Sequence, residues 1–428
     1  MVAPHLHFSL EHSSPCLATG FVSVDANVVA TVTEHVTNLY QQYRALPGYE
    51  HKTLPHAYAR SYFAAEIQQD TEEYLYKHMV LQFLLEQLTN NYILVANWPR
   101  LAAIQNENGA LLYQFTLPLA PSIVLKEWKH FVFKQPERKN YKDLDNQVLH
   151  FMKQAMDISR KQDHDTIEPN DWIYFSASLL DGTSEKPLFE QVQHYWMRLS
   201  PDEVLSTLQK SFIGKALHET FVVSALPFNS IFCASLQEPF KQEIKIELIS
   251  KGTHLSIDFF KSTFKLKTRA DVHKKLIEVF SFRNDISQRR LSIEELFHLL
   301  LSKHRYEIPK HIITRKKEVL LASLKKQSDY IVYKTSKNFD QNVTLLAEKS
   351  LKEELIIDHI TSAEGITVSS MDIAYYLHLF NNERLKEFIY FKPPVDNIED
   401  SAVPIHEAIL AQTVLREKTL NYVLHTLS

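Results

Sequence analysis

The segment LPGYEHKTLP, residues 46–55, lies between two long stretches of helical periodicity and has a proline near each end. Its glycine, Gly48, is one of only seven in 428 residues. Because so few positions of this chain are free to adopt positive φ, we expect each glycine to stand where a turn needs one. The segment therefore predicts the tip of a helix–loop–helix. An aromatic residue and a charge, Tyr49 and Glu50, at its apex favour contact with a partner.

The residues on both sides of this tip predict a small α+β domain. Apolar residues recur every three or four positions from Ala26 to Arg44, which indicates one helical stripe. A strand over residues 21–24 precedes that helix, and Pro55 starts the next one, where its missing N–H costs nothing. A helix over residues 71–90 and strands over 101–105 and 110–118 follow, with a hairpin turn at residues 106–109. We place this domain at residues 1–121.

The rest of the chain divides into a linker, a β-rich part and a helical part. Residues 122–133 indicate an extended connection and residues 139–161 a polar helix, so the linker is predicted at 122–164. Strands at 172–180, 221–225 and 240–249 predict a β-rich domain at 165–252. Helical stripes at 271–280, 289–303, 309–334, 338–363, 369–380 and 405–427 predict a helical domain at 253–428. The fold class is thus α+β, in several domains.

Composition narrows the classes of function. The net charge is −4, so no global basic field attracts nucleic acid or a membrane. Cys16 and Cys233 form neither a disulfide framework nor a metal set, which fits the cytoplasm. His5, His7 and His12 lie on what we expect to be a flexible end, and no metal or cofactor is predicted. The start lacks the pattern of a secretion signal, and no apolar run approaches the length of a membrane span.

Three segments together resemble a known family. Residues 48–55 read Gly-Tyr-Glu-His-Lys-Thr-Leu-Pro, residues 306–309 read Tyr-Glu-Ile-Pro, and a hydrophobic run from Ala347 to Ile360 precedes Glu-Gly-Ile-Thr-Val at 364–368. In order and spacing they resemble trigger factor, the bacterial ribosome-associated chaperone. The family's tip signature is Gly-Phe-Arg-x-Gly-Lys-x-Pro. Here Glu50, Lys52 and Thr53 replace its arginine, second glycine and lysine.

The resemblance implies a tail-binding-type N-terminal domain, a degenerate FK-binding-like domain and a large all-α domain. It also implies docking at the ribosome near the tunnel exit, through Gly48, Tyr49, Glu50, His51 and Lys52. Phosphate contact needs Arg or Lys, yet residues 1–120 hold five of these against ten Asp and Glu. We therefore expect weakened docking, with Lys52 and protonated His51 as partial compensation. A solvated turn without a partner stays an alternative.

For the middle domain, the resemblance implies a peptidyl-prolyl cis-trans isomerase. The matching positions have lost aromatic pocket wall, and the remnant comprises Phe189, Leu205, Leu208 and Phe221. We expect weak or absent isomerase activity. An active isomerase, with a pocket rebuilt from other aromatic residues, stays the alternative.

For the helical domain, the resemblance implies an ATP-independent chaperone whose partners are unfolded or nascent polypeptides. Such a chaperone needs apolar surface that binds many sequences weakly. Phe388, Ile389, Tyr390 and Phe391 are four consecutive apolar residues that cannot all face one helical stripe, so we predict client contact there. Residues 253–330 hold seventeen Lys and Arg against nine Asp and Glu, which indicates either a surface for the ribosome or acidic clients or solvated faces of helices. The sign is opposite to that of the first domain, which favours contact within the chain or a homodimer. A holdase that does not bind ribosomes stays a further alternative.

Overall fold

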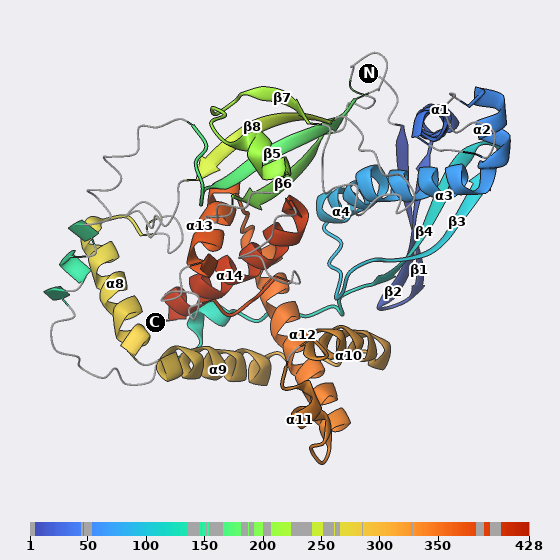
Figure 1. Ribbon diagram of the computed structural model, residues 1–428. Helices are drawn as coiled ribbons and strands as arrows, with labels where there is room; N and C mark the ends of the chain where they lie inside the picture. Colours follow the sequence, from blue (N-terminus) through green and yellow to red (C-terminus); the bar gives the residue numbers. More distant parts are fainter. Residues whose placement is uncertain are drawn as a thin grey trace.

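The computed structural model describes residues 5–43, 54–134, 166–180, 192–199, 207–223, 242–250, 266–284, 286–326, 328–381, 389–393 and 404–427. Isolated positions at 46, 145–146, 148–150, 152–153, 187 and 261 are described as well. The elements form two antiparallel sheets and a mostly helical C-terminal part (Figure 1). This confirms the predicted mixed α+β class. The predicted domain boundaries stay predictions, and the same ranges are used below as names.

The first domain is a four-stranded sheet covered by helices. Its strands are β1 (Leu6–Ser14), β2 (Leu17–Val24), β3 (Arg100–Glu107) and β4 (Ala110–Pro118), in the order β1-β2-β4-β3. Burial alternates strictly along β2, as expected of a strand with one face toward a core. The N-terminal segment was predicted to be flexible, and that was wrong: β1 pairs with β2 along its whole length. The alternation of apolar and polar residues at the start of this segment was the sequence signal for the strand.

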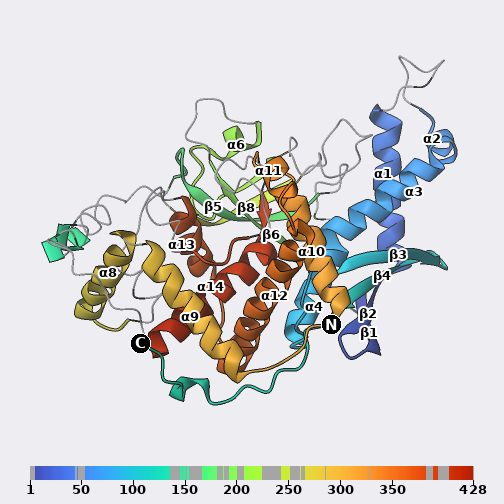
Figure 2. The same cartoon turned by 90° about the horizontal axis from the view of Figure 1, so that it is seen from below.

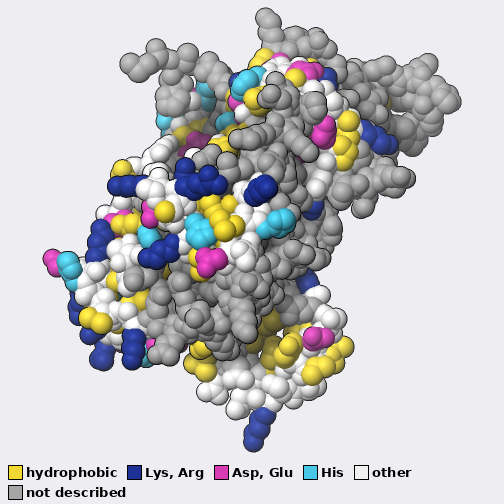
Figure 3. Space-filling view, turned by 90° about the vertical axis from the view of Figure 1, so that its left-hand side faces the viewer, with side chains coloured by type: hydrophobic (Ala, Val, Ile, Leu, Met, Phe, Trp, Pro, Cys, Tyr) yellow, Lys and Arg dark blue, Asp and Glu magenta, His cyan; other side chains and the backbone are white. Residues whose placement is uncertain are grey.

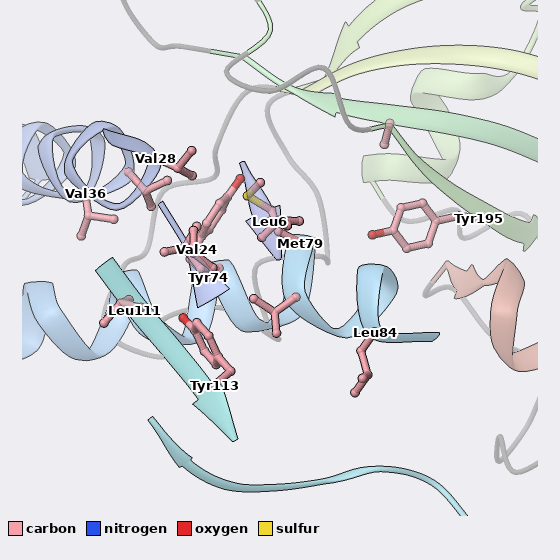
Figure 4. Close-up of a cluster of buried hydrophobic side chains, with 14 of the residues drawn as sticks. Leu6, Val24, Val28, Val36, Tyr74, Met79, Leu84, Leu111, Tyr113 and Tyr195 are labelled. Carbon is pink, nitrogen blue, oxygen red and sulfur yellow. The ribbon is translucent and has the colours of Figure 1, made fainter. Parts of the chain in front are cut away.

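Helices pack on the inner face of this sheet. They are α1 (Ala26–Tyr43), α2 (His56–Tyr62), α3 (Ala64–Leu75) and α4 (Leu81–Asn90), with one π-helical turn, η1 (Tyr76–Val80), between the last two. Apolar side chains from these helices meet β1, β2 and β4 in one core (Figure 4). The hairpin between β3 and β4 turns at Asn108 and Gly109, with φ of 53° and 88°. A tight hairpin turn of this kind needs positive φ at both central positions, and Asn followed by Gly adopts it most readily.

The β-rich domain is a five-stranded sheet in the order β7-β8-β5-β6-β9. Its own strands are β5 (Trp172–Leu179), β6 (Gln193–Arg198), β7 (Thr220–Val223) and β8 (Gln242–Ser250), and α6 (Thr207–Phe212) packs on it. The fifth strand, β9 (Ile405–His406), comes from the C-terminal part of the chain and pairs with β6. Sequence periodicity did not predict β9, because two residues contain no period.

The C-terminal part is helical, as predicted. Its helices are α8 (Arg269–Asn284), α9 (Ile286–Lys303), α10 (Lys310–Leu324), α11 (Tyr330–Lys334), α12 (Phe339–Glu364), α13 (Ser370–Asn381) and α14 (Glu407–Leu427). The single stripe predicted over 309–334 is two helices, because the chain turns at residues 325–329. The predicted linker helix over 139–161 lies largely outside the described residues. Residues 122–133 are extended apart from one 3-10 turn, η2 (Trp128–His130).

The β-rich sheet is covered on both faces by other parts of the chain. Trp172 and Trp196 pack against α13 and α14. The residues that alternate with them, such as Ile173 and Tyr195, join the core that the first domain also occupies. The first domain in turn touches the helical part, where Cys16 packs near Ile312 and Leu355. The described parts are therefore joined by continuous apolar contacts.

Candidate functional site

One part of the helical domain projects from the rest as an arm. It consists of α10, α11 and the first turns of α12, residues 310–346. Helices α10 and α12 pack side by side, and α11 connects them at the outer end (Figures 1 and 2). Pro309 stands at the N-cap of α10, where its fixed φ fits and its missing N–H is not needed. The outer end of the arm is thus presented to solvent by a helical pair.

The arm carries a group of exposed apolar side chains, here called the arm patch. Ile331 and Val332 of α11 expose 75% and 71% of their surface. The other members are at least about half exposed: Val319, Tyr333, Leu345 and Leu346. Hydrophobic side chains gather on the lowest lobe of the space-filling view, at the level of α11 (Figure 3). Contiguous exposed apolar surface on a folded protein marks a site of interaction.

The local sequence explains why these side chains stay exposed. Helix α11 reads Tyr-Ile-Val-Tyr-Lys and is only five residues long, so its four consecutive apolar residues point in all directions around it. None of its residues is buried. In α12, Leu345 and Leu346 are adjacent, and the buried stripe there uses Val343 and Ala347 instead. The sequence signal for the arm patch was therefore a run of four consecutive apolar residues in a helix too short to form one buried face.

The base of the arm is fixed by a buried network of charges. Arg416 of α14 donates from Nε and Nη2 to the two carboxylate oxygens of Asp358, at 2.8 and 2.7 Å. Its Nη1 lies 3.1 Å from Glu354, which also accepts from Lys316 of α10. Burial opposes ionisation of Glu354, but Arg416 and Lys316 outweigh it and lower the pKa of that carboxyl. The network ties α10, α12 and α14 together and so orients the arm.

The predicted tip lies between two described anchors. Gly48, Tyr49, Glu50, His51 and Lys52 themselves lie outside the described residues. Leu46 and Leu54 on either side are buried in the first domain's core. The chain is therefore anchored in that core on both sides of residues 47–53.

Directly after the tip, α2 presents a pair of partly exposed aromatic rings. Tyr58 and Tyr62 are stacked with their centroids 5.9 Å apart. They are one turn apart on the helix, which places both on the same side. Of the surface of Tyr58, 44% is exposed, and of that of Tyr62, 57%. The surface beside the tip is aromatic.

Comparison with known proteins finds similarity to trigger factors. The family model for the C-terminus of bacterial trigger factor protein matches residues 268–383, which include the whole arm. A trigger factor from Geobacter metallireducens is 20% identical over 424 residues, 94% of this chain and 93% of the relative. One from Desulforamulus reducens is 22% identical over 293 residues, 64% of this chain and 66% of the relative. The chain is thus similar to trigger factors, in its helical part by the family model and over most of its length by the Geobacter relative.

A solved structure is also similar along the whole chain. It is a trigger factor chaperone studied for promiscuous substrate recognition in folding and assembly. It covers 98% of this chain and 100% of its own at 14% identity, with a TM-score of 0.37.

The run of residues 388–391, which was predicted to contact clients, is largely buried in the described structure. Phe388 lies outside the described residues, but only 6% of Ile389 and 8% of Phe391 are exposed. Ile389 joins the core between the β-rich sheet and α13, and Phe391 the core of α9, α12 and α14. The carboxylate of Glu417 accepts from the backbone N–H groups of Tyr390 and Phe391, each at 3.0 Å. The prediction of exposed surface is therefore wrong for Ile389 and Phe391, because neighbouring elements cover an extended segment.

Two of the four isomerase-pocket remnants are described in the β-rich domain. Leu208 is fully buried in α6, and Phe221 of β7 packs edge-on against Phe212 at 5.1 Å between centroids. Phe212 also contacts Phe175, at 4.9 Å. Phe189 and Leu205 lie outside the described residues. The two described remnants thus belong to, or pack against, a core in which aromatic rings contact one another.

Two further observations on the described residues concern membrane spans and metal ligands. None of the described helices has the length and apolar character required to cross a bilayer. His5 and His7 flank Asp25, with nitrogen–oxygen distances of 3.5 and 3.7 Å. Within the described ranges, no three His, Cys, Asp or Glu side chains gather as they would around a metal ion.

Proposed function

We propose that this trigger factor relative is an ATP-independent chaperone of the cytoplasm. It docks at the ribosome near the tunnel exit and holds nascent or unfolded polypeptides on exposed apolar surface. The arm patch is the observation that carries this proposal. Apolar contact has no directional requirement, so one such surface accepts many sequences.

The arm patch suits weak and reversible holding. Fully covering one Val, Leu or Ile side chain is worth about 1.5–3 kcal/mol, and a client covers only part of each. Association and ordering of a flexible chain cost several kcal/mol in return. The net result is binding near the micromolar range, about −8 kcal/mol, from which clients dissociate readily. A chaperone must release its clients to let them fold.

The direct test is suppression of aggregation. A chemically denatured client is diluted into buffer with and without the protein, in the absence of nucleotide, and light scattering is followed. The proposal expects less scattering at stoichiometric protein, unchanged by ATP. Scattering that stays at the level of an inert protein of equal concentration would remove the chaperone function.

Ribosome docking is proposed for the tip, with lower affinity than the family's basic signature gives. The substituted signature and the acidic first domain weaken phosphate contact, whereas Tyr49, Lys52 and the nearby ring pair of Tyr58 and Tyr62 supply aromatic and cationic contact. Cosedimentation with ribosomes from the source organism tests this at moderate salt. Tyr49→Ala combined with Lys52→Ala should lower the bound fraction. Tyr92→Ala is a matched control, because Tyr92 is an exposed aromatic residue of the same domain. Equal binding by tip and control variants would exclude the tip.

Isomerase activity is proposed to be weak or lost. Desolvating an X–Pro bond needs an aromatic-lined pocket, and Phe175, Phe212 and Phe221 pack against one another instead. A proline tetrapeptide assay should give rates close to the uncatalysed reaction. Turnover near that of an active isomerase would overturn this part of the proposal and leave the chaperone part standing.

A homodimer belongs to the same proposal. Residues 1–120 carry a net charge of −5 and residues 253–330 one of +8, so two copies could pair opposite surfaces. Sedimentation at several salt concentrations tests it. A dimer held in this way should weaken as salt rises, because salt screens exposed charges. A monomer at low salt and high concentration would refute it.

A further inference from the structure

Strand β6 is a junction where three parts of the chain meet. On one side, His78 of η1 contacts Gln193, and Gln82 of α4 donates to the Val192 carbonyl just before the strand. On the other side, β9 of the C-terminal part pairs with Tyr195 and Trp196. Both contacts include a histidine, His78 from η1 and His406 from β9. Tyr195, which lies between them, is drawn beside the helix that carries Leu84 (Figure 4).

His406 is held in a way that requires its neutral form. Its Nδ1 accepts a hydrogen bond from the backbone N–H of Ala408, at 3.2 Å, at the start of α14. A protonated ring carries hydrogen on both nitrogens and cannot accept this bond. A positive charge at this place would also oppose the N-terminal end of the helix dipole. The ring packs edge-on against Tyr195, at 5.4 Å between centroids, so it has little room to turn away.

His78 lies on the opposite side of the same strand. Its Nδ1 is 3.3 Å from the side-chain oxygen of Gln193, which also accepts from the hydroxyl of Tyr195. The side-chain nitrogen of Gln193 donates back to the His78 carbonyl. Through Gln193 and Tyr195, a chain of contacts runs from His78 to His406. The hydrogen bonds of the first domain to β6 are therefore made by neutral polar groups rather than by ion pairs.

Among the described residues, the charged groups around the two histidines already have partners of their own. Lys77 is next to His78 and is paired with Glu73, and the ring of Tyr74 lies 4.7 Å from His78. Near His406, the third histidine, His194, stacks on Tyr174. The two carboxylates on that side, Glu407 and Glu247, accept hydrogen bonds from Tyr174 and Ser176 respectively, and Glu247 also pairs with Lys245.

Burial adds to the cost of protonation at both positions. It lowers the pKa of His406 to about 4, and His194 lowers it further in the same direction. Burial lowers the pKa of His78 to about 3, opposed by Gln193 and assisted by Lys77 and His406. His406 thus disfavours a charge on His78, although the two come from different parts of the chain.

The core that β9 helps to cover contains two tryptophans whose hydrogen-bonding capacity is not fully used. Trp172 and Trp196 are fully buried against α13 and α14. Among the described residues, nothing accepts a hydrogen bond from either indole N–H. A buried donor without an acceptor destabilises the closed arrangement, because water would satisfy it once the interface opened. These two buried N–H groups therefore lower the stability of the contact between the β-rich sheet and the helices α13 and α14.

We propose that His78 and His406 form an acid-sensitive latch on the two sides of β6. When both take up protons, β9 leaves β6, and the β-rich domain separates from the first domain and from α14. The histidines favour opening because their free rings bind protons more tightly than the buried rings do. Opening then occurs between about pH 6 and pH 4.5 and reverses on neutralisation.

The test is a pH titration of the full chain between pH 7.5 and 4.5. Small-angle X-ray scattering reports the radius of gyration, and intrinsic fluorescence reports exposure of the tryptophans. The wild type should expand and its emission should shift to the red over the same pH range, reversibly. The variant His78→Asn/His406→Asn keeps short hydrogen-bonding groups but cannot titrate, so its opening midpoint should move down by at least about one pH unit. His130→Asn is the matched control, because His130 is an exposed histidine, and it should behave as the wild type does.

Two results would overturn the latch. One is a wild type that stays closed to pH 4.5, and the other is a double variant that opens at the wild-type midpoint. If circular dichroism shows that the double variant does not fold, NMR of ¹³C-labelled histidine rings in the wild type decides instead. Two rings should stay neutral until expansion begins, and protonation of every ring without expansion would refute the latch. Neither readout requires a client or a ribosome, so failure here leaves the proposed function untouched.

Discussion

Replacing two residues of the arm patch, Ile331→Ser and Val332→Ser, should weaken client binding without affecting the fold. No residue of α11 is buried, so polar substitution there removes no core contact. Serine is also tolerated in a short exposed helix at a cost of a few tenths of a kcal/mol per residue. The double variant therefore changes the surface offered to a client and little else.

The size of the effect follows from how much of each side chain is available. Full burial of Ile or Val is worth about 1.5–3 kcal/mol. Since 75% and 71% of these side chains are exposed, a client that covered them completely would gain about 1–2 kcal/mol from each. A flexible client covers about half of that at any moment, so the pair contributes about 1–2 kcal/mol. This corresponds to a dissociation constant that rises about 5- to 30-fold.

Fluorescence anisotropy with a labelled, permanently unfolded client measures this constant directly. Val124→Ser/Val132→Ser is the matched control, because these linker valines are 86% and 91% exposed but lie outside the arm. The control should bind as the wild type does. If arm and control variants lose equal affinity, exposed apolar surface acts without regard to place. If the arm variant binds as the wild type does, the arm patch is not the client site.

Three further predictions concern stability and chemistry. Arg416→Met leaves Asp358 and Glu354 buried beside a lost partner and should destabilise the helical part by about 3–5 kcal/mol, seen as a lower thermal midpoint by circular dichroism; the exposed Arg290→Met should have almost no effect. The pKa values of His78 and His406 lie below 6.5, so the unfolded chain takes up protons first and the free energy of unfolding falls with pH below 6.5. At pH 5 the two together should cost about 4 kcal/mol, and a denaturation midpoint unchanged between pH 7 and pH 5 would contradict this. The rate of proline isomerisation should stay within a few-fold of the uncatalysed rate at micromolar protein, and a rate that rises in proportion to protein concentration would count against it.

Much of the fold could be predicted from local signals. The spacing of apolar residues located α1, α9, α12 and α14 to within a few residues, because a helix with one buried face must repeat every three to four positions. Asn108 and Gly109 marked the hairpin because both take positive φ. Strand β6 was missed because it is buried on both faces and does not alternate between apolar and polar residues.

The candidate site was harder to predict. Sequence reasoning placed client contact at residues 388–391 because four apolar residues in a row cannot share one helical stripe. The same logic applies to residues 330–333 of α11, where Ile331, Val332 and Tyr333 are exposed. An apolar run shows that some side chains need cover beyond their own element, but it does not show whether another element supplies that cover.

By itself, the sequence determined many of the local elements and the resemblance to trigger factors, since periodicity, turn residues and motif order depend on neighbours along the chain. Tertiary structure decided which apolar residues are exposed, and it brought His78, Gln193 and His406 together from positions more than 300 residues apart. Burial and pairing depend on what packs against a residue in space. The arm patch and the histidine junction therefore appeared only once the helices and strands were assembled.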